Sequence, residues 1–88
     1  MVWSIDFTPR AAKSFRKLDK PIQKEIRNFL REVSELEDPR ARGKALTGSM
    51  SRLWRWRVRD YRILASIRDR KVLIAIVGIG HRSTVYDL

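Results

Sequence analysis

The chain has no cysteine and only one histidine, His81. Without thiols it can form neither a disulfide nor a thiolate metal site. A lone imidazole holds zinc only beside several carboxylates, and none cluster near His81 in the sequence. No apolar run approaches the ~20 residues of a membrane span; the longest, Val72 to Ile79, fits a buried strand. We expect no metal, no cofactor and no contact with a membrane.

The N-terminal residues lack the basic and apolar regions of a secretory signal peptide, so a cytoplasmic location is expected. A length of 88 residues predicts a single domain over 1–88. With 43% hydrophobic and 34% charged residues, the composition is typical of a globular protein. The chain carries 20 Lys and Arg against 10 Asp and Glu, a net charge of +10. Such an excess favours nucleic acid, an anionic surface or an acidic protein as the partner.

Hydrophobic spacing predicts an α+β fold in the order β-α-α-β-β-β. Apolar residues alternate over 3–7, as in a strand, and recur at helical spacing in the two segments that follow. Thr8 and Pro9 have the residue types of a helix N-cap and first turn. The expected elements are a strand at 3–7, helices at 9–18 and 21–37, a loop at 40–51, and strands at 53–59, 61–67 and 71–77. We expect a mostly antiparallel four-stranded sheet, covered on one face by the helical hairpin and concave and basic on the other.

The segment 53–59, Leu-Trp-Arg-Trp-Arg-Val-Arg, carries the strongest functional signal. Because side chains alternate along a strand, Arg55, Arg57 and Arg59 should share one face, roughly 7 Å apart. Trp54 and Trp56 then point to the other face, where core packing is expected. Such a row of like charges is most easily kept if a polyanion covers it. The alternative is an ordinary solvated strand face.

A turn at Arg59-Asp60 resets the phase of the strand pattern. After the reversal, Arg62 can share the face of Arg55 and Arg57. Lys44, in the preceding loop, is a further candidate for contact with a nucleic-acid backbone, and a plain basic loop is the alternative.

Three strings together resemble the RelE/ParE superfamily of toxins from prokaryotic type II toxin–antitoxin systems. They are Lys-Ala-Leu-Thr-Gly at 44–48, Leu-Trp-Arg-Trp-Arg-Val-Arg-Asp-Tyr-Arg-Ile at 53–63, and Gly-His-Arg-Ser-Thr-Val-Tyr at 80–86. The pair Arg82 and Tyr86 favours the RelE branch. The resemblance implies a ribosome-dependent endoribonuclease that cleaves mRNA and inhibits translation, with an acidic cognate antitoxin, mRNA and ribosomal RNA as partners.

The resemblance also assigns roles to particular residues. Arg62 matches an arginine that holds the scissile phosphate, and Arg82 and Tyr86 match a second active-site arginine and a terminal aromatic residue. Arg55 and Arg57 match basic positions that are usually lysine. Arginine there keeps the charge but stays protonated, so it cannot transfer a proton in the reaction. Arg59 stands where many relatives have glycine, so the turn type is an open question.

The expected chemistry is attack of the RNA 2′-hydroxyl on the adjacent phosphate. It gives a 2′,3′-cyclic phosphate and a free 5′-hydroxyl, and it needs charge stabilisation and proton transfer. Arg62 and Arg82 suit the first task, since guanidinium donates in a fork. Tyr86 is the favoured base, because nearby guanidiniums favour phenolate. His81 is the alternative, because histidine is the side-chain type that ordinarily exchanges protons near neutral pH.

Two other functions stay open at this point. A ParE-like toxin would inhibit DNA gyrase by binding, with no nuclease chemistry. A basic nucleic-acid-binding module without toxicity would show only a steep loss of affinity with salt.

Overall fold

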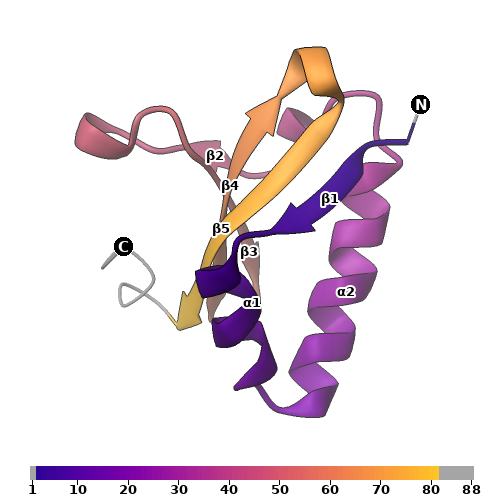
Figure 1. The fold of residues 1–88 in the computed structure, drawn as a ribbon, viewed down its shortest axis with the longest axis vertical. Coiled ribbons are helices and arrows are strands. Elements are labelled where there is room, and N and C mark those ends of the chain that lie inside the picture. The colour runs from indigo at the N-terminus through magenta and orange to yellow at the C-terminus, as the bar shows by residue number, and fades with distance from the viewer. Residues whose placement is uncertain (1, 82–88) are drawn as a thin grey trace.

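The computed structural model describes residues 2–81. Two helices and five strands follow one another along the chain, with three short 3₁₀ turns (η1–η3) between them (Figure 1). Their bounds are β1 Ser4–Phe7, α1 Pro9–Arg16, α2 Lys20–Ser34, η1 Pro39–Ala41, β2 Lys44–Ala45, η2 Gly48–Met50, β3 Trp54–Val58, β4 Tyr61–Arg68, η3 Asp69–Lys71 and β5 Leu73–His81.

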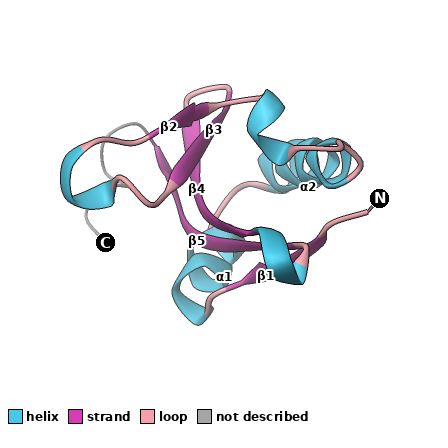
Figure 2. Cartoon of the chain, turned by 90° about the horizontal axis from the view of Figure 1, so that it is seen from above, coloured by secondary structure: helices cyan, strands magenta, loops and turns pink. Residues whose placement is uncertain are grey.

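The strands form one sheet in the order β1-β5-β4-β3-β2. The β1–β5 pair is parallel and the other three pairs are antiparallel. The α+β architecture and the mostly antiparallel sheet are therefore confirmed, but the expected number of four strands is wrong. The additional strand is β2, only two residues long, which pairs with β3 inside the segment expected to be loop. Figure 2 shows β1 and β2 at opposite ends of the curved sheet.

Local signals in the sequence account for the helical hairpin. The Thr8 side chain accepts a hydrogen bond from the Ala11 backbone N–H at 3.2 Å, which caps α1 as expected. The Gln23 side-chain amide donates to the backbone carbonyls of Leu18, at 2.9 Å, and Phe15, at 3.2 Å. Gln23 thus satisfies carbonyls at the end of α1 and fixes the angle between the helices. Both helices end a few residues earlier than the apolar spacing predicts.

The core lies between the helices and one face of the sheet. Along β4, Ile63 and Ala65 point toward the helices and are fully buried. Arg62 and Arg68 alternate with them and lie on the other face of the sheet. We call that opposite side of the sheet the open face. The core cluster comprises Trp3, Ala11, Ile26, Leu30, Val33, Trp56, Ile63, Ala65, Ile74, Ile76 and Ile79.

A bulge interrupts the β4–β5 pairing at the expected glycine-rich end of β5. Leu64 pairs with Gly78 and Ala65 with Ile76, so Val77 is the extra residue. The strand continues through Gly80 to His81 instead of ending near Val77. Because the extra residue lies in β5, the alternation of β4 stays regular, and its even-numbered residues from Arg62 to Arg68 share the open face.

Candidate nucleic-acid interface

Four basic residues from three strands lie together on the open face. Lys44 on β2 pairs in register with Arg55 on β3, and Arg57 pairs with Arg62 on β4. Directly paired residues lie on the same face of a sheet. The predicted phase change at the turn is thus confirmed, and Arg62 joins Arg55 and Arg57. We call Lys44, Arg55, Arg57 and Arg62 the basic face.

Three members of the basic face carry charge without a nearby acid in the part of the chain that the structure describes. Within the described residues, Lys44, Arg57 and Arg62 form no ion pair with a carboxylate. Arg57 and Arg62 are direct cross-strand partners, an arrangement that is unfavourable unless an anion lies between or above them. The surface therefore has the charge pattern of a binding site for a polyanion.

Arg62 is the most unusual member of this set. Its Nη1 atom is buried, and among the described residues it has no hydrogen-bond partner. A buried guanidinium nitrogen without a partner costs about 1–3 kcal/mol or more. A phosphate oxygen supplied by a ligand would satisfy it, because guanidinium binds phosphate in a two-pronged geometry. This atom is the clearest structural sign of an anion site.

Arg59 does not continue the row, so the prediction of three aligned guanidiniums on β3 is wrong. It occupies the β3–β4 turn at φ 54°, the left-handed conformation that glycine usually adopts. Its guanidinium makes two hydrogen bonds of 2.6 Å to Glu25 on α2. Hydrogen bonding to Arg59 lowers the pKa of Glu25, and the same bonds raise the pKa of Arg59. The sequence could not indicate this pair, since Glu25 lies 34 positions away.

Two arginines of the loop that precedes β2 are also paired with acids. Arg40 makes a bidentate contact with Asp69 in η3, at 3.0 and 2.8 Å, and its Nη1 lies 3.4 Å from Asp38. The contact with Arg40 lowers the pKa of Asp69. Arg42 binds Glu32 on α2 at 2.9 Å. Arg40, Arg42 and Arg59 thus each have a carboxylate partner, unlike Arg57 and Arg62.

The tryptophans of β3 hold this loop in place. The indole N–H groups of Trp54 and Trp56 both donate to the carbonyl of Arg42, at 2.6 and 3.0 Å. Trp56 is fully buried, as expected for a core residue. Gly43 follows at φ 89°, and a Cβ there would lie 2.3 Å from the Arg55 carbonyl oxygen. The loop can reach β3 this closely only because residue 43 is glycine.

This anchoring forms a hollow of about 320 Å³ beside the basic face. It is lined by Phe29, Arg42, Gly43, Lys44, Arg55, Trp56 and Arg57. Three of the four basic-face residues border it, so a ligand in the hollow would contact cations from both β2 and β3.

His81 lies apart from these arginines. It pairs in register with Tyr61, whose ring it meets edge-on at 5.3 Å between centroids. Its Nε2 lies 3.8 Å from an Asp60 carboxylate oxygen. Neighbouring residues of a strand point to opposite faces, so His81 and Arg62, which pairs with Gly80, lie on different sides of the sheet. The other predicted active-site residues, Arg82 and Tyr86, lie outside the described residues.

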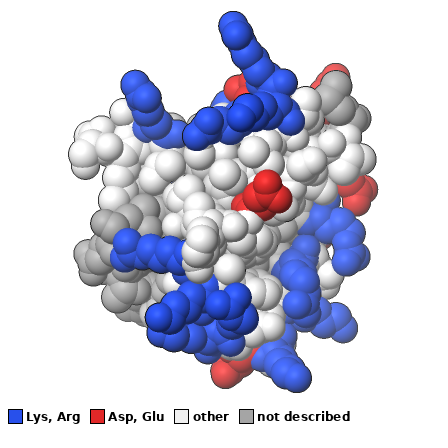
Figure 3. All heavy atoms as spheres, viewed as in Figure 1, with Lys and Arg blue, Asp and Glu red and all other residues white. Residues whose placement is uncertain are grey.

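Basic side chains also gather away from the basic face. Figure 3 shows Lys and Arg over the β4–β5 connection and over both helices, around a largely uncharged centre. Among residues 2–81 there is no group of His, Asp and Glu that could hold a metal ion. No helix in that range is both long and apolar enough to cross a bilayer.

Comparison with known proteins identifies the family. The model of the ParE toxin of type II toxin–antitoxin systems matches residues 5–86. The chain belongs to the RelE/ParE family of toxins. It is 33% identical over 91 residues to the mRNA interferase toxin RelE of Escherichia coli, which covers 99% of this chain and 93% of that protein.

Solved structures support the same assignment. The RelBE2 toxin–antitoxin complex of Mycobacterium tuberculosis contains a chain with a TM-score of 0.84 and 25% identity, covering 94% of each chain. The isolated E. coli RelE toxin has a TM-score of 0.70 and 30% identity, covering 96% of this chain and 90% of that one. The predicted family and fold are thus confirmed.

Proposed function

We propose that this protein is the toxin of a type II toxin–antitoxin system and inhibits translation by cleaving mRNA in the cytoplasm. The observation that carries the proposal is the Nη1 atom of Arg62, which is buried without a partner among the described residues and belongs to the direct cross-strand partner of Arg57 on the basic face. The relatives named mRNA interferase, at 33% identity over nearly the whole chain, support the same activity.

In this mechanism Arg62 holds the scissile phosphate. The ribose 2′-oxygen attacks phosphorus and loses its proton to a base, while the bond to the 5′-oxygen breaks and that oxygen gains a proton. The products are a 2′,3′-cyclic phosphate and a 5′-hydroxyl. Charge on the phosphorane is greatest in the transition state, so a preorganised guanidinium lowers the barrier more than it strengthens ground-state binding. Arg82 is proposed to donate to the same phosphate.

Tyr86 is the proposed general base. The described part of the basic face offers ammonium and guanidinium groups, neither of which accepts a proton easily near neutral pH. His81 could accept one, but it occupies the other side of the sheet from Arg62. Weak proton transfer by the toxin alone is consistent with dependence on the ribosome, whose RNA would align the reacting groups.

Lys44, Arg55 and Arg57 are proposed to bind the RNA backbone beside the scissile bond. Arg59, already bonded to Glu25, could reach RNA only by leaving that partner or by sharing it. A net charge of +10 also suits an acidic antitoxin, which would compete with RNA for the same cations.

Primer extension on mRNA in a translating extract tests the proposal. The wild-type protein should produce discrete new 5′ ends, and Arg62→Ala should reduce the cleavage rate by about 10²–10³, the effect of losing one charge-stabilising donor. Arg31→Ala removes an exposed arginine from α2 and serves as the matched control. Equal cleavage by Arg62→Ala and the control would refute the role of Arg62. Tyr86→Phe tests the base in the same assay.

Gyrase inhibition is the second candidate, because the matching family model is that of the ParE toxin. It predicts accumulation of cleaved DNA in a supercoiling assay, with intact mRNA in the extract. A binding inhibitor needs no phosphorane stabilisation. In that case neither the wild type nor Arg62→Ala would cleave mRNA, and Arg62→Ala would still inhibit gyrase almost as strongly as the wild type.

A further inference from the structure

Arg68 places a cation at the far end of the open face. The sequence suggests a hairpin turn at this position, but Arg68 is the last residue of β4 and pairs with Leu73. It shares its side of β4 with Arg62, six residues earlier. At about 3.3 Å per residue, the two positions are roughly 20 Å apart along one regular strand.

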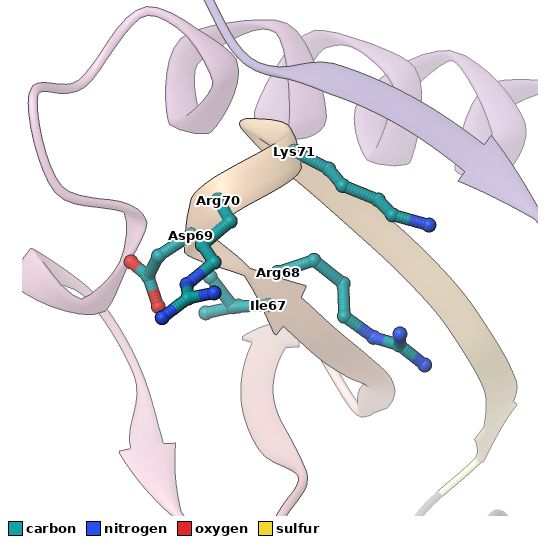
Figure 4. Close-up of a pocket in the computed structure, with 5 residues that line it drawn as sticks. All are labelled: Ile67, Arg68, Asp69, Arg70 and Lys71. Carbon is teal, nitrogen blue, oxygen red and sulfur yellow. The ribbon is translucent and has the colours of Figure 1, made fainter.

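Lys71 adds a second cation at this end. A hollow of about 480 Å³ is lined by Ile67, Arg68, Asp69, Arg70 and Lys71. Figure 4 shows the side chains of Arg68 and Lys71 extending to the β5 side of the connection, whereas Asp69 and Arg70 lie on the other side. We call Arg68 and Lys71 the distal pair.

The distal pair has no carboxylate partner within residues 2–81. The Arg68 Nε atom donates to the Ser66 hydroxyl at 3.2 Å, which orients the guanidinium and leaves its other donors available. The acid of the turn, Asp69, is bound in bidentate fashion by Arg40. The charge of the distal pair is therefore as uncompensated, within the described residues, as that of Arg57 and Arg62.

Between the two cationic ends, neither β4 nor β5 carries an acidic side chain on the open face. The register places Leu64, Ser66, Ala75 and Gly78 on this stretch; Leu64 and Gly78 are buried, whereas Ser66 and Ala75 are partly exposed. Glycine in a strand interior often marks close approach of another backbone. Within the described residues, the acidic side chain that the register assigns to this face is Asp6, on the edge strand β1, two strands away from β4.

We propose that the distal pair binds a backbone phosphate of the same mRNA strand whose scissile phosphate lies at Arg62. The inference rests on the proposed function and extends it from one phosphate to a stretch of single-stranded RNA. The two ends belong to one strand of the sheet and one face of the molecule, so a single continuous RNA backbone can reach both. The contact is independent of base identity, because Lys and Arg recognise only the phosphate.

Binding of two uncleavable 2′-O-methyl RNA oligonucleotides to the free protein tests this inference. The short one reaches only the basic face, and the long one spans the additional ~20 Å to the distal pair. Arg68→Ala/Lys71→Ala should weaken the long oligonucleotide by about tenfold or more and leave the short one unchanged. The slope of log affinity against log salt should fall by about 1.4 for the long oligonucleotide, ~0.7 for each lost contact.

Two controls make the result decisive. Arg70→Ala removes one charge from the same turn on the other side and should leave both affinities nearly unchanged. Arg62→Ala should weaken both oligonucleotides; if it weakens neither, the proposed function fails whatever the distal pair does. Equal weakening of short and long RNA by the double variant, or an equal effect of Arg70→Ala, would mean general electrostatic attraction and overturn the inference. If the double variant binds the long oligonucleotide normally and loses affinity only for ribosomes, the inference is overturned, and the distal pair instead contacts ribosomal RNA.

Discussion

Arg62 is a single residue that both indicates an anion site and destabilises the free protein. Its buried Nη1 atom has no hydrogen-bond partner among the described residues, and its cross-strand neighbour is another arginine. Proteins keep such unfavourable groups mainly where binding or catalysis requires them.

Arg62→Met should therefore stabilise the free protein while abolishing RNA cleavage. Methionine keeps much of the side-chain length and removes both the unsatisfied donor and the repulsion with Arg57, so the free energy of unfolding should rise by ~1 kcal/mol. Urea denaturation of the two proteins measures the change. A clear loss of stability would show that Arg62 has a structural role in the free protein.

Gly43→Ala should be strongly destabilising. The backbone at Gly43 has φ 89°, and the new Cβ would meet the Arg55 carbonyl oxygen at 2.3 Å. Strain of this kind together with a clash against backbone should cost more than ~2 kcal/mol. Gly48→Ala is the matched control, since Gly48 also has a positive φ, of 67°, but a Cβ there meets nothing within 4 Å. Denaturation midpoints that shift equally in both variants would contradict this explanation.

The sequence was sufficient for the parts of the site that depend on alternation. Strand periodicity placed Trp54 and Trp56 in the core and Arg55 and Arg57 outside, and the two-residue turn brought Arg62 to the same face. It could not locate Arg59, whose Glu25 partner comes from a helix packed beside the turn. It also assigned Arg68 to a turn, because the boundary between a strand and a polar hairpin has no periodic signal.

An ion pair links α2 to the β3–β4 turn and thus connects two elements that are distant in the sequence. Glu25 on α2 binds Arg59 in the turn through two short hydrogen bonds. This bond holds the turn that sets the register of Arg57 against Arg62, so it connects the helical layer to the site.

Glu25→Gln should lower the melting temperature at neutral pH but not in acid. Hydrogen bonding to Arg59 lowers the pKa of Glu25, so its contribution to stability is present above the ordinary glutamate pKa of about 4.3 and is lost as the pH falls through the lowered value. Thermal melts across this pH range should show that the difference in melting temperature between wild type and variant becomes smaller as the pH falls. Glu37→Gln is the control, and the difference between its melting temperature and that of the wild type should not shrink in this way.

Strand β2 shows why the strand count was wrong. Its two residues lie within a glycine-containing loop, and two residues are too few to show alternation. They pair with β3 because the indoles of Trp54 and Trp56 bind the Arg42 carbonyl and hold the preceding loop against it. This tertiary cause is not visible in the local sequence.

The whole molecule has an uneven distribution of compensated charge. Acids on α2 and in the loops neutralise Arg40, Arg42 and Arg59, whereas Lys44, Arg57, Arg62 and the distal pair lack such partners among the described residues. Lys and Arg also lie over both helices (Figure 3), so the net charge of +10 is spread over the molecule, and Arg57, Arg62 and Arg68 on the open face are among the cations without a carboxylate partner in the described residues. We expect the excess of positive charge to attract the proposed partners, RNA and an acidic antitoxin, over long range.

RNA binding should depend steeply on salt. Four to six phosphate contacts on a single strand correspond to a slope of about −3 to −4 in log affinity against log salt concentration. Fluorescence anisotropy with labelled, uncleavable RNA over a range of salt concentrations measures the slope. A value near zero would contradict binding through the open-face cations.

The most direct test of the account is mapping of mRNA 5′ ends in cells after induced expression of the wild type and of Arg62→Ala. The account predicts new 5′ ends within coding sequences for the wild type and their near disappearance for the variant at equal protein level. The same set of new ends from both proteins would contradict it.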